Sequence, residues 1–189
     1  MSLIEGPARE ETLRLWAWLE KKYGASKAQL YPHPHITYYY GLLGNADVWE
    51  IERGLERISS VFRPLEVFID GVDVFSSEVI YLAVRRTPEL DRLQMLIGDL
   101  VEKCGAEPVR NYRPGNWVPH VTLAVEDLKP PAFSAALREL SEQRISLRSA
   151  VSSLKFYQDS GPEGSSTQKD WPLGPREEPG ANGQPLARG

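Results

Sequence analysis

Two of the three histidines in this 189-residue chain are followed two positions later by a threonine. His35 and Thr37 lie within PHITYYYGL, and His120 and Thr122 lie within PHVTLAV. Both stretches are rich in β-branched, aromatic and other apolar residues, which is typical of β-strands. Because side chains alternate between the two faces of a strand, each histidine and its threonine project to the same side, about 7 Å apart.

Four such side chains can act together on a phosphate ester. Two imidazoles supply a general base and a general acid near neutral pH. Two hydroxyls can donate hydrogen bonds to the non-bridging oxygens of the phosphate. If the two strands meet side by side, the set suits in-line attack of water on a phosphodiester, with the leaving oxygen protonated from the opposite side. A single motif of this kind is more often an ordinary strand histidine, but two on apolar strands favour a catalytic pair.

The elements that must position these residues follow from periodicity and end signals. We expect helices from Pro7 to before Gly24, from Asn45 or Asp47 to about residue 60, from Thr87 to before Gly105, and from Pro130 and Pro131 onward. We expect strands over 3–6, the stretch HITYYYGL (35–42), 65–75, 78–84 and 120–125, and a closing hairpin formed by strands around 151–157 and 166–173.

The order of these elements repeats. A short strand, a helix, a strand carrying His-x-Thr and a second helix occupy residues 3–60, and the same order returns over residues 79–143. The residues outside the motifs barely match, so the repeat lies in the element order rather than in sequence identity. We therefore predict two pseudo-equivalent lobes, each offering one motif to a shared cleft.

Composition and charge limit the partners. The net charge is −4, whereas a protein that coats duplex DNA needs a basic face. A partner that carries phosphate is therefore expected to be small or to be held only at one end. No stretch approaches the roughly 20 apolar residues of a membrane span. The single cysteine, Cys104, cannot form an internal disulfide and fits a reducing, cytoplasmic compartment.

The last part of the chain has a different composition. Residues 174–189 read GPREEPGANGQPLARG, which is rich in Gly and Pro and contains almost nothing apolar. Such a segment cannot bury enough surface to fold, so it is predicted to be a disordered tail. The remainder, residues 1–173, is expected to form a single bilobal domain and to act as a monomer.

The stretches PHIT and PHVTLA, each after a helix and about half the chain apart, resemble the signature of the two-histidine phosphoesterase superfamily. This superfamily includes 2'-5' RNA ligase-like proteins and 2',3'-cyclic phosphodiesterases. The resemblance extends from residue 1 to about 173 and includes Trp171 on the expected closing strand. It implies an α+β fold with two antiparallel sheets, flanked by helices, on either side of a central cleft. It also implies that neither a metal nor another cofactor is needed.

The same resemblance assigns roles to the motif residues. His35 and His120 are expected to be catalytic, and Thr37 and Thr122 to bind the substrate phosphate. The expected reaction is hydrolysis of a 2',3'-cyclic phosphate, on a nucleotide or an RNA terminus, to a 2'-phosphate. Two alternatives remain open: a module of the same fold that binds nucleotides or RNA ends without turnover, and a 2'-5' RNA ligase.

Other residues are candidates for substrate contact. Tyr39 shares a strand face with His35 and can stack on a base. Arg110 and Arg113 precede the second motif and can contact a terminal phosphate, although loop arginines are often only solvated. Three more aromatic residues are weaker candidates because strand aromatics usually belong to the core: Tyr112, Trp117 and Tyr157.

His33 is the remaining histidine. A metal site formed by His33, His35 and His120 is possible, but no Cys, Asp or Glu lies beside them to complete the ligand set. A histidine-triad motif is excluded because Thr37 stands where the third histidine is needed. We therefore expect a structural or peripheral role for His33.

Overall fold

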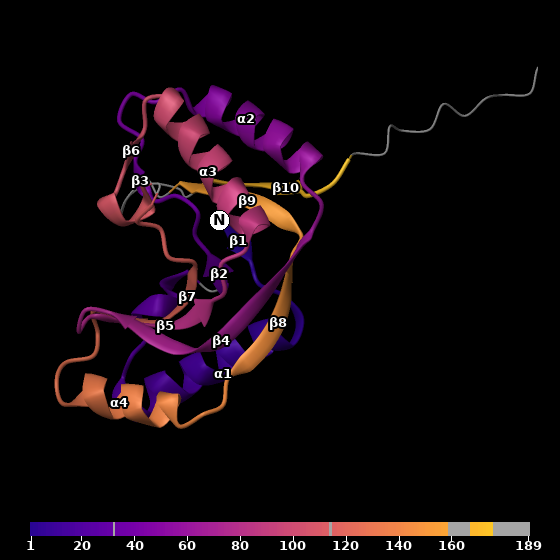
Figure 1. The fold of residues 1–189 in the computed structure, drawn as a ribbon. Helices are drawn as coiled ribbons and strands as arrows, with labels where there is room; N and C mark the ends of the chain where they lie inside the picture. Colours follow the sequence, from indigo (N-terminus) through magenta and orange to yellow (C-terminus); the bar gives the residue numbers. More distant parts are fainter. Residues whose placement is uncertain (32, 114, 159–166, 176–189) are drawn as a thin grey trace, which may run out of the picture.

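The computed structural model describes residues 1–31, 33–113, 115–158 and 167–175. Within these residues the fold is α+β, with four α-helices and several antiparallel sheets (Figure 1). The helices are α1 (Gly6–Tyr23), α2 (Val48–Val61), α3 (Pro88–Lys103) and α4 (Ala132–Ser141), and two short 3-10 helices are η1 (Lys27–Leu30) and η2 (Arg110–Tyr112).

The helix ends confirm the signals read from the sequence. The side chain of Asp47 accepts a hydrogen bond from the backbone N–H of Glu50 at the start of α2. Thr87 does the same for the N–H of Leu90 at the start of α3. Each bond satisfies a donor that the first turn of a helix leaves free. Gly24 ends α1 in the left-handed conformation, with φ of 75°.

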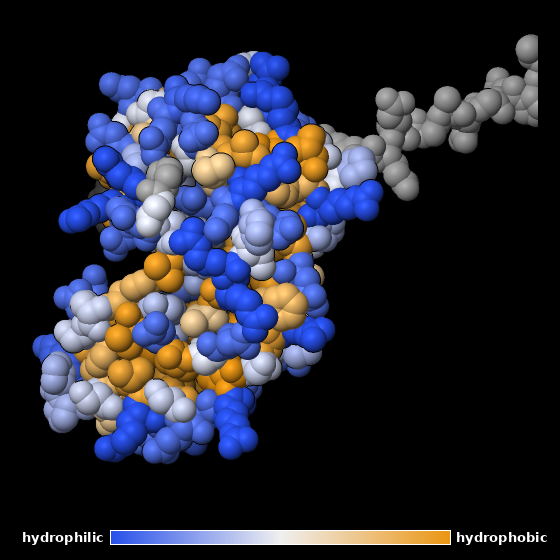
Figure 2. Space-filling view, viewed as in Figure 1, coloured by the Kyte–Doolittle hydropathy of each residue, from blue (hydrophilic) through white to orange (hydrophobic). Residues whose placement is uncertain are grey.

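The largest sheet has four antiparallel strands in the order β7-β5-β4-β8. Its strands are β4 (Leu65–Phe75), β5 (Val79–Val84), β7 (His120–Val125) and β8 (Ser146–Val151). Helices α1 and α4 lie against it in the lower part of Figure 1. In Figure 2, hydrophobic residues gather on the visible face of this lower part. The sheet places β7, with the second His-x-Thr motif, at its edge.

The other strands pair two by two and form a second group under α2 and α3. β1 (Ser2–Leu3) pairs with β2 (His35–Ile36), β3 (Gly41–Leu42) pairs with β6 (Glu107–Pro108), and β9 (Ser153–Gln158) pairs with β10 (Thr167–Pro172). The N–H of Lys155 donates to the carbonyl of Met1 at 2.7 Å, which links β9 to β1. In Figure 1, β3, β6, β9 and β10 lie in the upper part with α2 and α3, and β1 and β2 lie between them and the four-stranded sheet. His35 of the first motif is on β2.

The prediction of one continuous strand over 35–42 is wrong for the middle of this stretch. The structure contains β2 and β3 instead, and residues 37–40 between them belong to no strand. The two pieces separate because they pair with different partners, β1 and β6. Gly41 allows the second pairing, since a Cβ at this position would lie 2.1 Å from the carbonyl oxygen of Glu107.

The C-terminal hairpin is confirmed as β9 and β10, but the sequence-based prediction missed β8. The single strand expected around 151–157 is the junction of two strands in different sheets, divided at Ser152. β8 is an edge strand in which half of the residues are polar, so it lacks the apolar pattern that identifies buried strands.

Most of the predicted tail, 174–189, lies outside the described residues. Gly174 is described, and its N–H donates to the carbonyl of Ser59 at 3.0 Å. No helix in the described part of the chain combines the length and the apolar character needed to cross a bilayer.

Candidate active site

The fold brings the two His-x-Thr motifs together from its two groups of strands. β2 lies beside β7 in the structure, although the two strands are far apart in the sequence. Across β7, Thr122 is paired with Tyr81 and His120 with Ala83. His35 and His120 are close enough for a charge on His120 to contribute to the lowered pKa of His35. The two imidazoles therefore lie within electrostatic reach of each other.

Both histidines are held in the same way. The Nδ1 atom of His35 lies 2.8 Å from the carbonyl oxygen of His33. The Nδ1 atom of His120 lies 2.7 Å from the carbonyl oxygen of Val118. A carbonyl can only accept, so each Nδ1 carries the proton and donates it. This tautomer leaves Nε2 of each neutral imidazole with a free lone pair that can accept a proton from a substrate or a water molecule.

An aromatic ring packs edge-on against each imidazole. The ring of Tyr31 lies 5.0 Å from that of His35 at 85°, and the ring of Phe75 lies 4.9 Å from that of His120 at 85°. Tyr81 adds a second contact to His120 at 5.3 Å. These contacts, together with the Nδ1 bonds, restrain the orientation of both imidazoles.

Burial lowers the pKa of both histidines. The pKa of His35 falls from 6.5 to about 4, chiefly because burial disfavours the charged imidazole. Burial also lowers the pKa of His120, opposed by the hydrogen bond to Val118. Both imidazoles are therefore neutral at pH 7 in the free protein. A bound phosphate, being negative, favours protonation of a neighbouring imidazole and so raises its pKa.

A cavity of about 600 Å³ opens beside the first motif. His35 and Thr37 line it, whereas His120 and Thr122 are not among its lining residues. Two predicted contacts, Tyr39 and Tyr157, also line this cavity. The rest of its wall is largely apolar and includes Leu43, Leu55, Ile97, Val101, Leu154 and Phe156.

The remaining predicted contacts do not line this cavity. Arg110 and Arg113 are exposed, in or next to η2, and do not line the cavity. The charge of Arg113 nevertheless acts on Tyr39. Burial raises the pKa of Tyr39, and the positive charge of Arg113 partly opposes this rise. Trp117 is only 1% exposed, so its ring offers no open face for a base to stack on. Tyr112 packs beside Tyr40, and its phenol also interacts with the side chain of Thr37, which opposes the rise that burial causes in the pKa of Tyr112.

Sequence reasoning missed Lys155 and Tyr31. Lys155 lines the cavity, its side chain is 11% exposed, and its Nζ lies 2.8 Å from Oδ2 of Asp170. It occupies the same strand face as Tyr157, two residues on, so strand alternation applied from Tyr157 would have pointed to Lys155. Tyr31 gave no comparable signal, because it precedes β2 and meets His35 only in the folded chain.

His33 contributes its backbone rather than its ring. Its carbonyl accepts the Nδ1 bond of His35, and its imidazole packs against Tyr31 at 5.6 Å. This fits the structural role expected for it. In the residues that the structure describes, no three His, Cys, Asp or Glu side chains gather closely enough to hold a metal ion.

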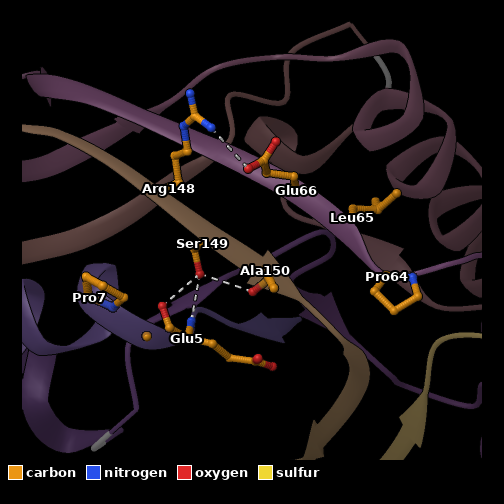
Figure 3. Close-up of a pocket in the computed structure, with 9 residues that line it drawn as sticks. Glu5, Pro7, Pro64, Leu65, Glu66, Arg148, Ser149 and Ala150 are labelled. Atoms are coloured by element: carbon orange, nitrogen blue, oxygen red, sulfur yellow. Dashed lines mark hydrogen bonds and ion pairs between the residues drawn. The ribbon is translucent and has the colours of Figure 1, made fainter.

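A second hollow, of about 520 Å³, lies at the start of α1 and along β4 and β8 (Figure 3). Its polar groups are already paired with each other. Ser149 Oγ accepts a hydrogen bond from the backbone N–H of Glu5 at 2.7 Å, and Arg148 lies 3.8 Å from Glu66. Neither motif lines this hollow, so we do not place the active site there.

Comparison with known proteins gives one family and several similar folds. The model of the 2'-5' RNA ligase superfamily matches residues 7–163. TT0787 of Thermus thermophilus has a TM-score of 0.62 at 16% identity, over 91% of this chain and 95% of that one. E. coli LigT complexed with 3'-AMP has a TM-score of 0.57 at 20% identity, over 90% of this chain and 95% of that one. LigT complexed with ATP has a TM-score of 0.51 at 17% identity, over 91% of this chain and 95% of that one. The comparison with curated proteins gives no match.

Proposed function

Because this chain belongs to the 2'-5' RNA ligase superfamily, we propose that it is a phosphodiesterase that hydrolyses a 2',3'-cyclic phosphate to a 2'-phosphate by acid–base catalysis. The substrate is a nucleotide or an RNA terminus. The observation that carries the proposal is the matched state of His35 and His120, each neutral, held through Nδ1 and free at Nε2. Once a bound phosphate favours protonation of one of them at Nε2, such a pair can remove one proton and deliver another on opposite sides of a phosphorus atom.

The proposed reaction is a single in-line displacement. One imidazole accepts a proton from water through Nε2 as the water oxygen attacks phosphorus. The bond from phosphorus to O3' breaks, and O3' receives the Nε2 proton of the second imidazole, which begins the step as an imidazolium. The product carries a 3'-hydroxyl and a 2'-phosphate. The hydroxyls of Thr37 and Thr122 donate to the non-bridging oxygens, where negative charge accumulates in the transition state.

The two histidines differ in how strongly their surroundings oppose charge. Only His35 shows a large shift, to a pKa of about 4, so it stays neutral throughout the physiological pH range. A base must begin the reaction neutral, which suits His35. His120, whose pKa is lowered less, is more readily protonated once an anionic phosphate is bound, which suits the acid.

The cavity beside His35 and Thr37 suits the nucleoside part of the substrate. It combines aromatic and aliphatic walls with the polar side chains of His35 and Thr37, as small-molecule sites commonly do. Tyr39 and Tyr157 can contact a base there, and Lys155 adds a cation that attracts phosphate. The nucleotide complexes of E. coli LigT, a protein of similar fold, support a nucleotide ligand.

The test is turnover of defined substrates in the presence of EDTA. We expect 2',3'-cyclic nucleotides or an RNA ending in a cyclic phosphate to be hydrolysed, with the 2'-phosphate identified by phosphorus NMR. His35→Ala and His120→Ala should each lose about 10²–10⁴-fold in rate. The double variant should lose less than the product of the two single losses, because the histidines act as a unit.

His33→Ala serves as the matched control, since only its backbone holds His35. It should keep activity within about threefold of the parent, because the carbonyl that accepts the Nδ1 bond is retained. Binding of the cyclic nucleotides without any product would instead identify a binding module. Full activity in His35→Ala would contradict the paired site.

A further inference from the structure

We infer that Trp16 and Trp117 are positioning residues that hold the two threonines in place for the reaction, an inference that rests on the proposed function. The indole N–H of Trp117 donates to the carbonyl of Thr37 at 2.8 Å. The indole N–H of Trp16 donates to the carbonyl of Thr122 at 2.9 Å. Each motif threonine is thus held through its own backbone by a tryptophan.

Both carbonyls lie at positions where the sheets provide few backbone N–H groups to pair with them. β2 ends at Ile36, so Thr37 lies just beyond the β1–β2 ladder. Thr122 lies on β7, the edge strand of the four-stranded sheet, next to an irregularity in the β5–β7 pairing. A buried backbone carbonyl without a partner is costly, and edge strands leave one row of such groups free. The two indoles supply the missing donors.

The tryptophans are buried, and each comes from the other half of the chain. Trp16 is 3% exposed and Trp117 is 1% exposed. Trp16 belongs to α1, in the first half, and holds the second motif. Trp117 precedes β7, in the second half, and holds the first motif. A large, fully packed ring has little freedom to move, so the carbonyl bonded to it is fixed as well.

The threonine hydroxyl is attached to the same residue as the bonded carbonyl. If the carbonyl moves, the hydroxyl and the neighbouring histidine move with it. Misplacement of a reacting group by about 1 Å can cost about 10²-fold in rate. The indole bonds therefore affect catalysis without any contact between tryptophan and substrate.

Trp16→Phe and Trp117→Phe test this inference, because phenylalanine keeps an aromatic ring and removes the N–H donor. We expect kcat on a 2',3'-cyclic nucleotide to fall at least about tenfold in each variant, with a smaller change in KM. The control is Trp171→Phe, at a tryptophan on β10 that is also buried (8% exposed). Its melting temperature should fall about as much as in the other two variants, while kcat stays within about twofold of the parent.

Pairwise combinations provide a readout that general destabilisation cannot reproduce. Trp117→Phe combined with Thr37→Val should lose less than the product of the two single effects, because the indole acts through that threonine. When Trp117→Phe is combined with Thr122→Val, the loss of activity should be close to the product of the two single losses. The pattern should be reversed for Trp16→Phe. Equal coupling to both threonines, or tryptophan variants as active as Trp171→Phe, would overturn the inference.

The same couplings can be measured in the affinity for adenosine 2'-phosphate, by calorimetry. If the parent turns over no cyclic phosphate, the proposed function fails, and the inference is then decided by these affinities. If either phenylalanine variant does not fold, β-(3-benzothienyl)alanine at the same position replaces the N–H by sulfur and keeps the shape. An activity equal to the parent in that variant would also overturn the inference.

Discussion

Among the individual residues, the site consists of two similar half-sites. Each contains an imidazole bonded through Nδ1 to the carbonyl two residues earlier, an edge-on aromatic ring, and a threonine whose carbonyl accepts an indole bond. The contacts with the carbonyls and aromatic rings restrain the orientation of the two imidazoles, and burial favours their neutral form. Under the proposed function, the threonine hydroxyls and the Nε2 atoms contact the substrate, and the side chain of Thr37 also interacts with the phenol of Tyr112.

The threonine hydroxyls should matter more than the threonine shape. Thr37→Val and Thr122→Val keep the β-branched volume but remove a donor to a charged oxygen, which costs about 1.5–3 kcal/mol. We therefore expect kcat/KM to fall by about tenfold to hundredfold in each variant. Thr→Ser at the same positions keeps the donor and should retain most activity. A folded double valine variant as active as the parent would show that the phosphate is held elsewhere.

The lowered pKa of His35 predicts how stability depends on pH. The unfolded chain takes up a proton near pH 6.5, whereas the folded chain does so only near pH 4. The unfolded state therefore binds more protons in this window, and stability falls as the pH drops through it, by at most about 1.4 kcal/mol per pH unit for this group. Well above the unfolded pKa the effect vanishes.

Denaturant unfolding of the parent and of His35→Gln, from about pH 7 down to about pH 4.5, measures this contribution. The variant should lose less stability than the parent on acidification, although His120 contributes a slope of its own. Identical slopes in the two proteins would show that His35 titrates normally in the folded state.

Among the helices and strands, the approach of β3 to β6 depends on one glycine. A Cβ at Gly41 would meet the backbone of Glu107 and Pro108, neither of which can swing away as a side chain can. Gly41→Ala should therefore push the two strands apart and cost about 1–3 kcal/mol of stability. Gly41 also lines the cavity, so KM for a cyclic nucleotide should rise.

Gly98→Ala is the matched control, because a Cβ in that part of α3 meets only Gln94 Nε2, at 3.9 Å. This change should stabilise the helix by about 0.5–1 kcal/mol. Thermal unfolding of both variants checks the pair. If the melting temperature of Gly41→Ala equals or exceeds that of the parent, β3 and β6 do not lie as close as the structure places them.

For the molecule as a whole, the tail is predicted to make no contribution to the fold. Its composition cannot bury surface, and Gly174, which bonds to Ser59, precedes most of it. Truncation after Pro175 should leave the melting temperature and turnover unchanged. A clear drop in either quantity would mean that the tail docks on the domain.

Local sequence signals were sufficient to predict the helices, the second motif strand and the chemistry expected of the two motifs. Helix caps such as Asp47 and Thr87 act over three residues, and hydrophobic periodicity acts over a few turns, so both can be recognised without the fold. The family resemblance also followed from the motifs, and the match over residues 7–163 confirms it.

Features that depend on distant partners could be found only in the folded chain. β2 stops at Ile36 because β1 is short, and β8 and β9 separate because they join different sheets. The indole bonds to Thr37 and Thr122 span 80 and 106 residues of sequence. Local propensity carries no information about such contacts, because they form only when the chain closes long loops and packs its core.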